Sequence, residues 1–201
     1  MENFVYLGVT NGLGAGIIIN GQLYRRQSGF AGEIGHTTVD LSGEKCPCGN
    51  YGCLELYVSI PRIIEQVKTA LLAETKSILR NICPDINRVT WPMIIKGALQ
   101  GDGLALNIID KISFYLSTGL TNILNTFDPQ AVFLGNELSI AGSLLVDRLK
   151  AKVSQRMFAE NFRKMDIRIS KFARESPVVG AAAIVLEKFY TGQLNSMVFK
   201  Q

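Results

Sequence analysis

The sequence lacks three features that would place a protein in a class at once. No apolar run approaches the ~20 residues that a transmembrane helix needs, so no membrane span is predicted. The first ten residues, MENFVYLGVT, lack the basic and apolar segments of a signal peptide. Lys and Arg are scattered and the formal net charge is only +4, which argues against a nucleic-acid groove. We therefore expect a cytoplasmic protein.

Cysteine and histidine are also scarce, with four cysteines and one histidine among 201 residues. Disulfides are rare in the cytoplasm, so the cysteines need another explanation. The remaining composition, 47% hydrophobic and 19% charged, is that of a chain that buries a core. A chain of this length forms one domain or two small ones, and we find no internal repeat in it.

The chain opens with a predicted β-meander over residues 3–27. Its segments FVYLGVT and GAGIIINGQLYRR are apolar, and a glycine-rich turn separates the first two strands. Asn20-Gly21 fits a type I′ turn, because both positions tolerate positive φ. Residues 28–56 then show neither helical nor strand periodicity, and a loop of this length is unusual in a compact domain. Something other than apolar packing has to order this loop.

Helices and strands alternate over the rest of the chain. Ser59 and Thr90 are predicted N-caps of two helices. A long amphipathic pattern predicts a helix over residues 103–127, which Asp128-Pro129 would end. The order of elements predicts a layered α/β domain. The last predicted elements are a strand at 131–135, a helix around Leu145 and Leu149, a strand at 166–172, and a helix from Ser176-Pro177 to Gly192.

The aperiodic loop contains the only histidine, His36, and three of the four cysteines, Cys46, Cys48 and Cys53. Three thiolates and an imidazole are a standard ligand set for tetrahedral zinc, and a closed set of four protein ligands is structural rather than catalytic. Zinc would also explain how the loop is ordered, because metal binding contributes ordering free energy. The C-x-C spacing differs from that of common zinc fingers, and the alternative is three reduced, incidental cysteines.

The same residues match a family pattern. GFAGEIGHTTVD followed by CPCGNYGCLE resembles the signature of the ROK family of repressors, open reading frames and kinases, E-x-G-H, a spacer and C-x-C-G-x-x-G-C-x-E. The resemblance extends to GLGAGIIINGQLYR, NILNTFDPQAVFLG and VVGAAAIVLEKF, and so covers most of the chain. It implies a structural Zn²⁺ ion. The fixed positions here are Glu33, Gly35, His36, Cys46, Cys48, Gly49, Gly52, Cys53 and Glu55.

The resemblance also implies a fold and a ligand. The fold would be the C-terminal lobe of an actin/hexokinase-like (ribonuclease H-like) α/β ATPase fold, spanning 1–201, with an inserted zinc and sugar loop at 28–56 and a tail at 193–201. In such proteins two glutamates beside the metal-bound histidine hydrogen-bond sugar hydroxyls. Here the corresponding residues are Glu33, Glu55 and His36. Carboxylates suit this role because they accept hydrogen bonds from neighbouring hydroxyls, and the metal would support the loop that presents them.

Two parts of the family's kinases have no counterpart in this sequence. These are an Asp-x-Gly-Gly/Thr phosphate loop and an Asn-Asp pair whose Asp is the general base, so we expect no catalytic residue and no phosphoryl transfer by this chain alone. The nucleotide-binding positions that the resemblance implies are Gly12, Gly14 and Gly135, where glycine would let the backbone approach a phosphate. Their surroundings are altered, because Thr10-Asn11 replaces Gly-Thr and Glu137 adds a negative charge. We expect a degenerate nucleotide site; without the resemblance, GLGAG indicates only a hairpin turn.

These features favour a regulator over an enzyme. We expect the sugar-binding effector lobe of a ROK-family transcriptional regulator, a repressor of carbohydrate-metabolism genes, which contacts operator DNA only through an absent N-terminal helix-turn-helix. The alternatives are the C-terminal half of an ATP-dependent, glucokinase-like sugar kinase and a zinc-stabilised interaction domain. A homodimer or tetramer is expected, with the helix at 103–127 and the last helix as candidate surfaces. Which sugar binds is not predicted, because specificity would lie partly in the missing N-terminal lobe.

Overall fold

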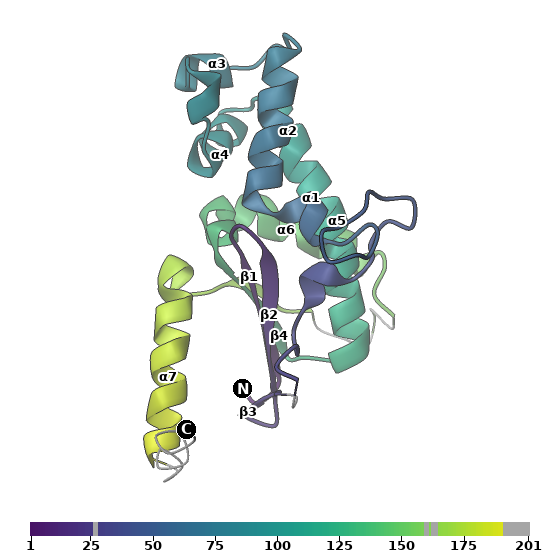
Figure 1. Cartoon of the computed structure of the whole chain (residues 1–201), viewed down its shortest axis with the longest axis vertical. Coiled ribbons are helices and arrows are strands. Elements are labelled where there is room, and N and C mark those ends of the chain that lie inside the picture. Colours follow the sequence, from purple (N-terminus) through teal and green to yellow (C-terminus); the bar gives the residue numbers. More distant parts are fainter. Residues whose placement is uncertain (26–27, 159–160, 162–164, 191–201) are drawn as a thin grey trace.

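The computed structural model describes residues 1–25, 28–158, 161 and 165–190. Figure 1 shows a sheet with most of the helices gathered at one end and one side of it, and with the last helix standing apart. The predicted tail and the predicted helix end at Gly192 lie outside the described residues. Among the helices that are described, none combines the length and the apolarity needed to cross a bilayer.

Five strands form one sheet in the order β3-β2-β1-β4-β5. The β1–β2 and β2–β3 pairs are antiparallel, whereas β4 is parallel to both β1 and β5. The predicted meander and both later strands are therefore confirmed. Asn20 and Gly21 have φ of 52° and 73°, as the predicted turn requires. The strands are β1 Phe4–Val9, β2 Leu13–Ile19, β3 Gln22–Leu23, β4 Ala131–Asn136 and β5 Ile167–Ile169.

The helices confirm most of the predicted elements. Ser59 and Thr90 do occupy N-cap positions, but neither side chain accepts a capping hydrogen bond. The helical elements of three to five residues were not predicted, since each is too short to show a helical period. The α-helices are α1 Glu55–Val58, α2 Ile60–Leu72, α3 Leu79–Ile82, α4 Trp91–Leu99, α5 Gly103–Phe127, α6 Gly142–Ser154 and α7 Ser176–Tyr190. The 3-10 segments are η1 Ile34–His36, η2 Ile86–Arg88, η3 Glu137–Ala141 and η5 Ala173–Glu175.

The long helix α5 forms the centre of the core. Asp102 caps its first turn, because Oδ1 accepts from the Ala105 N–H at 2.8 Å while Oδ2 accepts from the Ile78 N–H at 2.8 Å. The helix ends at Asp128, whose φ of 44° is left-handed. Its apolar side is buried within the chain, so this stripe belongs to the core rather than to a surface for a second copy.

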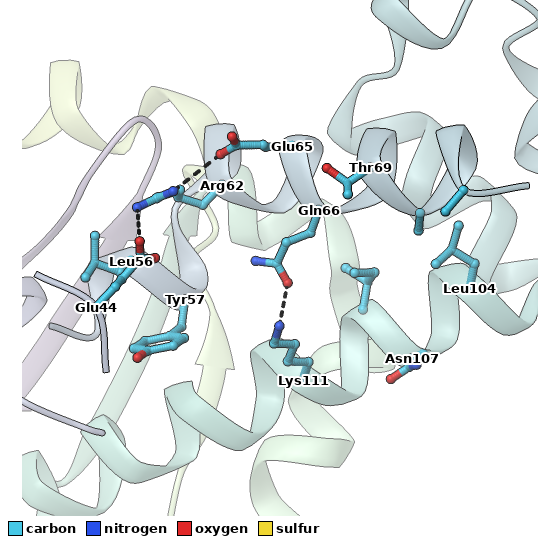
Figure 2. A pocket seen from close by; sticks show the side chains of 13 residues that line it. Glu44, Leu56, Tyr57, Arg62, Glu65, Gln66, Thr69, Leu104, Asn107 and Lys111 are labelled. Atoms are coloured by element: carbon cyan, nitrogen blue, oxygen red, sulfur yellow. Dashed lines mark hydrogen bonds and ion pairs between the residues drawn. The ribbon is translucent and has the colours of Figure 1, made fainter. Parts of the chain in front are cut away.

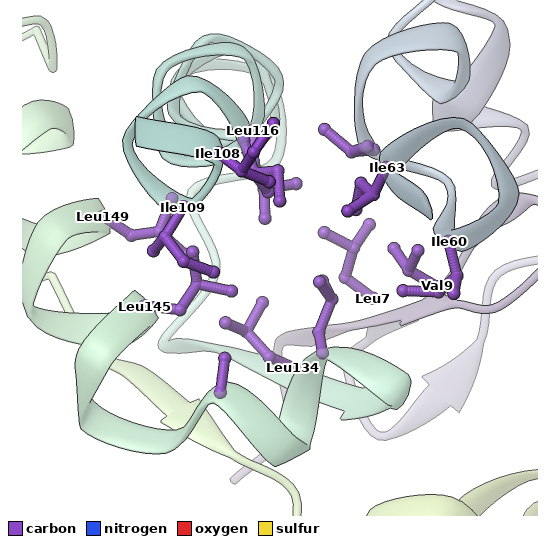
Figure 3. Close-up of a cluster of buried hydrophobic side chains, with 14 of the residues drawn as sticks. Leu7, Val9, Ile60, Ile63, Ile108, Ile109, Leu116, Leu134, Leu145 and Leu149 are labelled. Carbon is purple, nitrogen blue, oxygen red and sulfur yellow. The ribbon is translucent and has the colours of Figure 1, made fainter. Parts of the chain in front are cut away.

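One face of the sheet packs against this helical layer. Val5, Leu7 and Val9 of β1 are buried on that face, as the period of two along a strand requires. Figure 3 shows side chains from α2, α5 and α6 meeting Leu7, Val9 and Leu134 of the sheet in one cluster. The other face, with Phe4 and Tyr6, borders a cavity of about 530 Å³ that α7 closes on its far side.

Candidate metal and ligand site

The loop brings the four predicted metal ligands together. Nδ1 of His36 lies 3.8 Å from Sγ of Cys46, and Sγ of Cys48 lies 3.7 Å from Sγ of Cys53. All four candidate ligand atoms lie within 4.8 Å of one another. A tetrahedral site with Zn–S bonds of ~2.3 Å separates its sulfurs by ~3.8 Å. The spacing and the donor set therefore fit one metal ion.

Tight backbone turns produce this convergence. Gly49 and Gly52 have φ of 97° and 61°, a region that suits glycine. The Gly49 N–H donates to the carbonyl of Cys46 at 2.9 Å and closes the turn that carries two of the sulfurs. Thr38 and Cys53 pair as an isolated antiparallel bridge, which returns the chain to the histidine. Hydrogen bonds and glycine turns thus order the loop together with the apolar side chains of Ile34, Val39 and Leu54, which pack in or against the core.

The thiols sit in contrasting environments. Cys53 is fully buried, and its burial raises the pKa of the thiol to about 12. Cys48 is exposed, and a backbone hydrogen bond from Asn50 lowers the pKa of its thiol. Because a thiol binds metal as thiolate, a bound cation would have to displace the proton from Cys53.

Tyr57 of α1 ties the loop to the helical layer. Its hydroxyl donates to Oδ2 of Asp40 at 3.2 Å, and its ring stacks on Tyr115 of α5 with the centroids 3.9 Å apart. Burial, with a second contribution from Asp40, raises the pKa of Tyr57 to about 12. A Cβ on Gly43 would collide with the Tyr57 hydroxyl, so the loop passes directly over it. Nothing in the sequence signals this contact, and it was not predicted.

A groove of about 590 Å³ lies between α2 and α5 beside the loop (Figure 2). Arg62 of α2 pairs with Glu44 of the loop at 3.0 Å and with Glu65 at 3.4 Å. Nζ of Lys111 donates to Oε1 of Gln66 at 2.8 Å. These polar groups satisfy one another near the surface, where ion pairs stabilise little. The groove contains none of the predicted site residues.

The two predicted sugar-binding glutamates approach β2 from opposite ends of the loop. Oε2 of Glu55 accepts from the Leu13 N–H at 2.9 Å. The Ala15 N–H donates to the carbonyl of Gly32 at 2.8 Å, which places the next residue, the exposed Glu33, beside β2 as well. Both acidic residues thus lie beside residues 13–15. In the sequence, each is close to one of the metal ligands.

The predicted nucleotide glycines do not form an open cradle. Gly14 and Gly135 lie in register on either side of Gly8, on strands β2 and β4. Space is free above Gly14, whereas a Cβ on Gly135 would collide with the hydroxyl of Tyr6. That hydroxyl donates to Oδ1 of Asn136 at 2.9 Å, so the chain's own side chains cover Gly135. Tyr6 was missed from the sequence because its partner is 130 residues away.

The negative charge predicted at Glu137 is not free. Its carboxylate pairs with Arg174 at 2.7 Å, and its carbonyl accepts from Nε1 of Trp91 at 2.7 Å. The guanidinium of Arg174 therefore lies beside the carboxylate whose negative charge was expected to disfavour a nucleotide. Gly12, the third predicted glycine, faces the Glu55 carboxylate instead of open space.

The fold, a mixed α/β sheet with helices, is of the actin-like class found in transcriptional regulators and sugar kinases. The ROK family model matches residues 1–188. The xylose repressor of Bacillus subtilis strain 168 is 36% identical over 188 residues, which are 94% of this chain and 45% of the repressor. A ROK family transcriptional regulator, a homologue of the E. coli Mlc protein, matches with a TM-score of 0.86 at 28% identity, over 98% of this chain and 48% of that one.

A ROK family glucokinase from Streptomyces griseus, solved with glucose and AMPPNP, has a TM-score of 0.82 at 27% identity, over 91% of this chain and 60% of that one. The chain belongs to the ROK family, as its loop motif predicted. It spans about half the length of the curated relatives that it matches.

Proposed function

We propose that the chain is the sugar-binding effector lobe of a ROK transcriptional regulator that represses genes of carbohydrate metabolism. The observation that carries this proposal is that the loop which brings the four metal ligands together also places Glu55 and the backbone next to Glu33 against β2. The relative named as a xylose repressor supports the regulatory reading. The proposed regulator acts in the cytoplasm as a homodimer or tetramer.

In the proposed site the metal is zinc and its role is structural. His36, Cys46, Cys48 and Cys53 hold it, which closes all four positions of a tetrahedral ion. Glu33 and Glu55 accept hydrogen bonds from neighbouring sugar hydroxyls, and His36 borders the same ligand. Unpaired carboxylates would disfavour molecules that lack matching hydroxyls, which gives the site its selectivity.

The proposed mechanism is a population shift. A sugar that binds one arrangement of the regulator better than another changes the affinity for operator DNA by that difference in binding free energy. The operator is contacted by a helix-turn-helix segment of the whole regulator and not by residues of this lobe.

A second candidate is a sugar kinase, which the similarity to a glucokinase solved with AMPPNP favours. Against it, Tyr6 and Asn136 cover Gly135, where the nucleotide would lie. The kinase reading also needs a general base, and no residue of this chain was predicted to supply one.

Metal analysis and calorimetry test the proposal. Purified protein should contain about one zinc ion per chain. Titration with xylose, glucose, N-acetylglucosamine and N-acetylmannosamine should give saturable heat with at least one of them, whereas AMPPNP should give none. AMPPNP binding with sugar-dependent ATP hydrolysis would support the kinase instead. A chain that contains zinc but binds none of these sugars would be a metal-stabilised interaction domain.

A further inference from the structure

The glycine-rich turn between β1 and β2 touches one of the proposed sugar-binding side chains. Oε2 of Glu55 accepts from the Leu13 N–H at 2.9 Å. A Cβ added to Gly12 would lie 2.7 Å from the same oxygen, closer than carbon and oxygen approach without a shift. The carboxylate therefore occupies the volume that a side chain at position 12 would take.

This contact fixes one oxygen of the carboxylate and leaves the other available. Among the described residues, Oε1 of Glu55 has no hydrogen-bond partner, and it lies 3.9 Å from the Cβ that Gly12 lacks. A carboxylate offers about four acceptor positions, so one N–H donor leaves most of them for a ligand. The Ile60 N–H donates to the carbonyl of Thr10 at 3.0 Å, which ties the other side of the turn to the start of α2.

The loop that carries the metal ligands also contacts Leu13 near its other end, beside His36. Gly35, next to the metal ligand His36, lies so close to the Leu13 carbonyl that an added Cβ would collide with it. Leu13 itself is buried. One residue thus contacts the loop near its histidine through its carbonyl and meets Glu55 through its amide.

We infer that the β1–β2 turn, Thr10 to Leu13, is a positioning element of the sugar site. The Leu13 N–H orients the Glu55 carboxylate, and Gly12 leaves the space that this orientation needs. The inference rests on the proposed function. It reassigns the glycine-rich turn, because the glycine at position 12 serves a carboxylate of the protein rather than the phosphate of a nucleotide.

The test compares two glycine substitutions in the same hairpin. Gly12→Ala displaces the carboxylate, whereas Gly16→Ala meets only Cβ of Tyr6 at 4.0 Å, an ordinary contact. Neither glycine has a positive φ, so alanine fits both backbones. For the sugar that the unaltered chain binds best, Gly12→Ala should weaken binding about tenfold to a hundredfold, the value of a hydrogen bond to a charged group. Gly16→Ala should bind within about twofold of the unaltered chain.

Two further readouts separate positioning from general support of the fold. Zinc content should stay at about one ion per chain in both variants, since no metal ligand is touched. Amide exchange of Leu13, measured without sugar, should be slow in the unaltered chain, fast in Glu55→Ala and partly restored in Glu55→Gln, whose amide oxygen still accepts the N–H.

Each remaining outcome overturns the inference. Sugar affinity unchanged in Gly12→Ala, or Leu13 exchange unchanged in Glu55→Ala, overturns the inference while leaving the proposed function intact. Loss of zinc from Gly12→Ala makes the turn a support of the metal loop instead. Failure of the unaltered chain to bind any sugar overturns the proposed function, and the inference with it.

Discussion

The loop that carries the metal ligands, residues 28–56, and helix α7 differ in how well their composition predicts their burial. The loop is rich in glycine and polar residues, yet it buries Cys46 and Cys53 and is crossed by close backbone contacts. Helix α7 is mostly apolar, yet none of its residues is buried, and Leu186 and Tyr190 are largely exposed. Figure 1 shows the difference, since the loop lies against α1 and α5 whereas α7 stands away from the helical layer.

The difference separates two sources of order. In the loop, much of the order comes from directional bonds, which act only when particular partners are present, so a single partner matters greatly. In α7, whose residues are at most half-buried, tertiary packing contributes less, because a helix gains tertiary stability from an apolar side that is buried. Substitutions should therefore have large effects in the loop and small ones in α7, although α7 is far more apolar.

The largest effect is expected from removing a metal ligand. Cys53→Ser should lower zinc content from about one ion per chain to almost none, because the site loses a thiolate ligand. Limited proteolysis should then cut within residues 38–52, while the helical circular dichroism of the core stays near that of the unaltered chain.

Cys83→Ser is the matched control. Cys83 is buried outside the cluster, and its thiol donates to the carbonyl of Asp85 at 3.0 Å, a bond that a serine hydroxyl can also make. This variant should keep its zinc and its resistance to protease. A loop that resists protease equally in zinc-free Cys53→Ser would show that its backbone hydrogen bonds and packing order it without the metal, against this prediction.

Sequence reasoning predicted those parts of the molecule that repeat or cluster along the chain. The helical period of apolar residues in α5 and their alternation in β1 predict which side of each element is buried. The metal cluster was predictable because its three cysteines lie within eight residues of one another. Tyr57 with Asp40 and Leu13 with Glu55 could not be predicted this way. Each pair joins single residues far apart in the sequence, and no period or motif records such a contact.

A smaller effect is expected where the loop meets the helical layer. Tyr57→Phe keeps the stacked ring but removes the hydroxyl that donates to Asp40, a loss of about 1 kcal/mol. Zinc transfer to a competing chelator should therefore be favoured about threefold to tenfold relative to the unaltered chain. Tyr115→Phe, at the other ring of the stack, should transfer zinc like the unaltered chain. Equal behaviour of the two variants would mean that stacking alone holds the loop.

The smallest effect is expected in α7, where the contrast is sharpest. Leu186→Ala removes an exposed side chain and should change the free energy of unfolding by no more than about 0.5 kcal/mol. Leu116→Ala makes the same change in the middle of α5, where the side chain is fully buried, and should cost about 2–5 kcal/mol. Urea denaturation of both variants gives the comparison directly. Because both substitutions remove the same atoms within a helix, their difference measures burial alone. A loss at Leu186 as large as that at Leu116 would mean that α7 is covered in solution, and its apolar side chains would then stabilise the protein as core residues do.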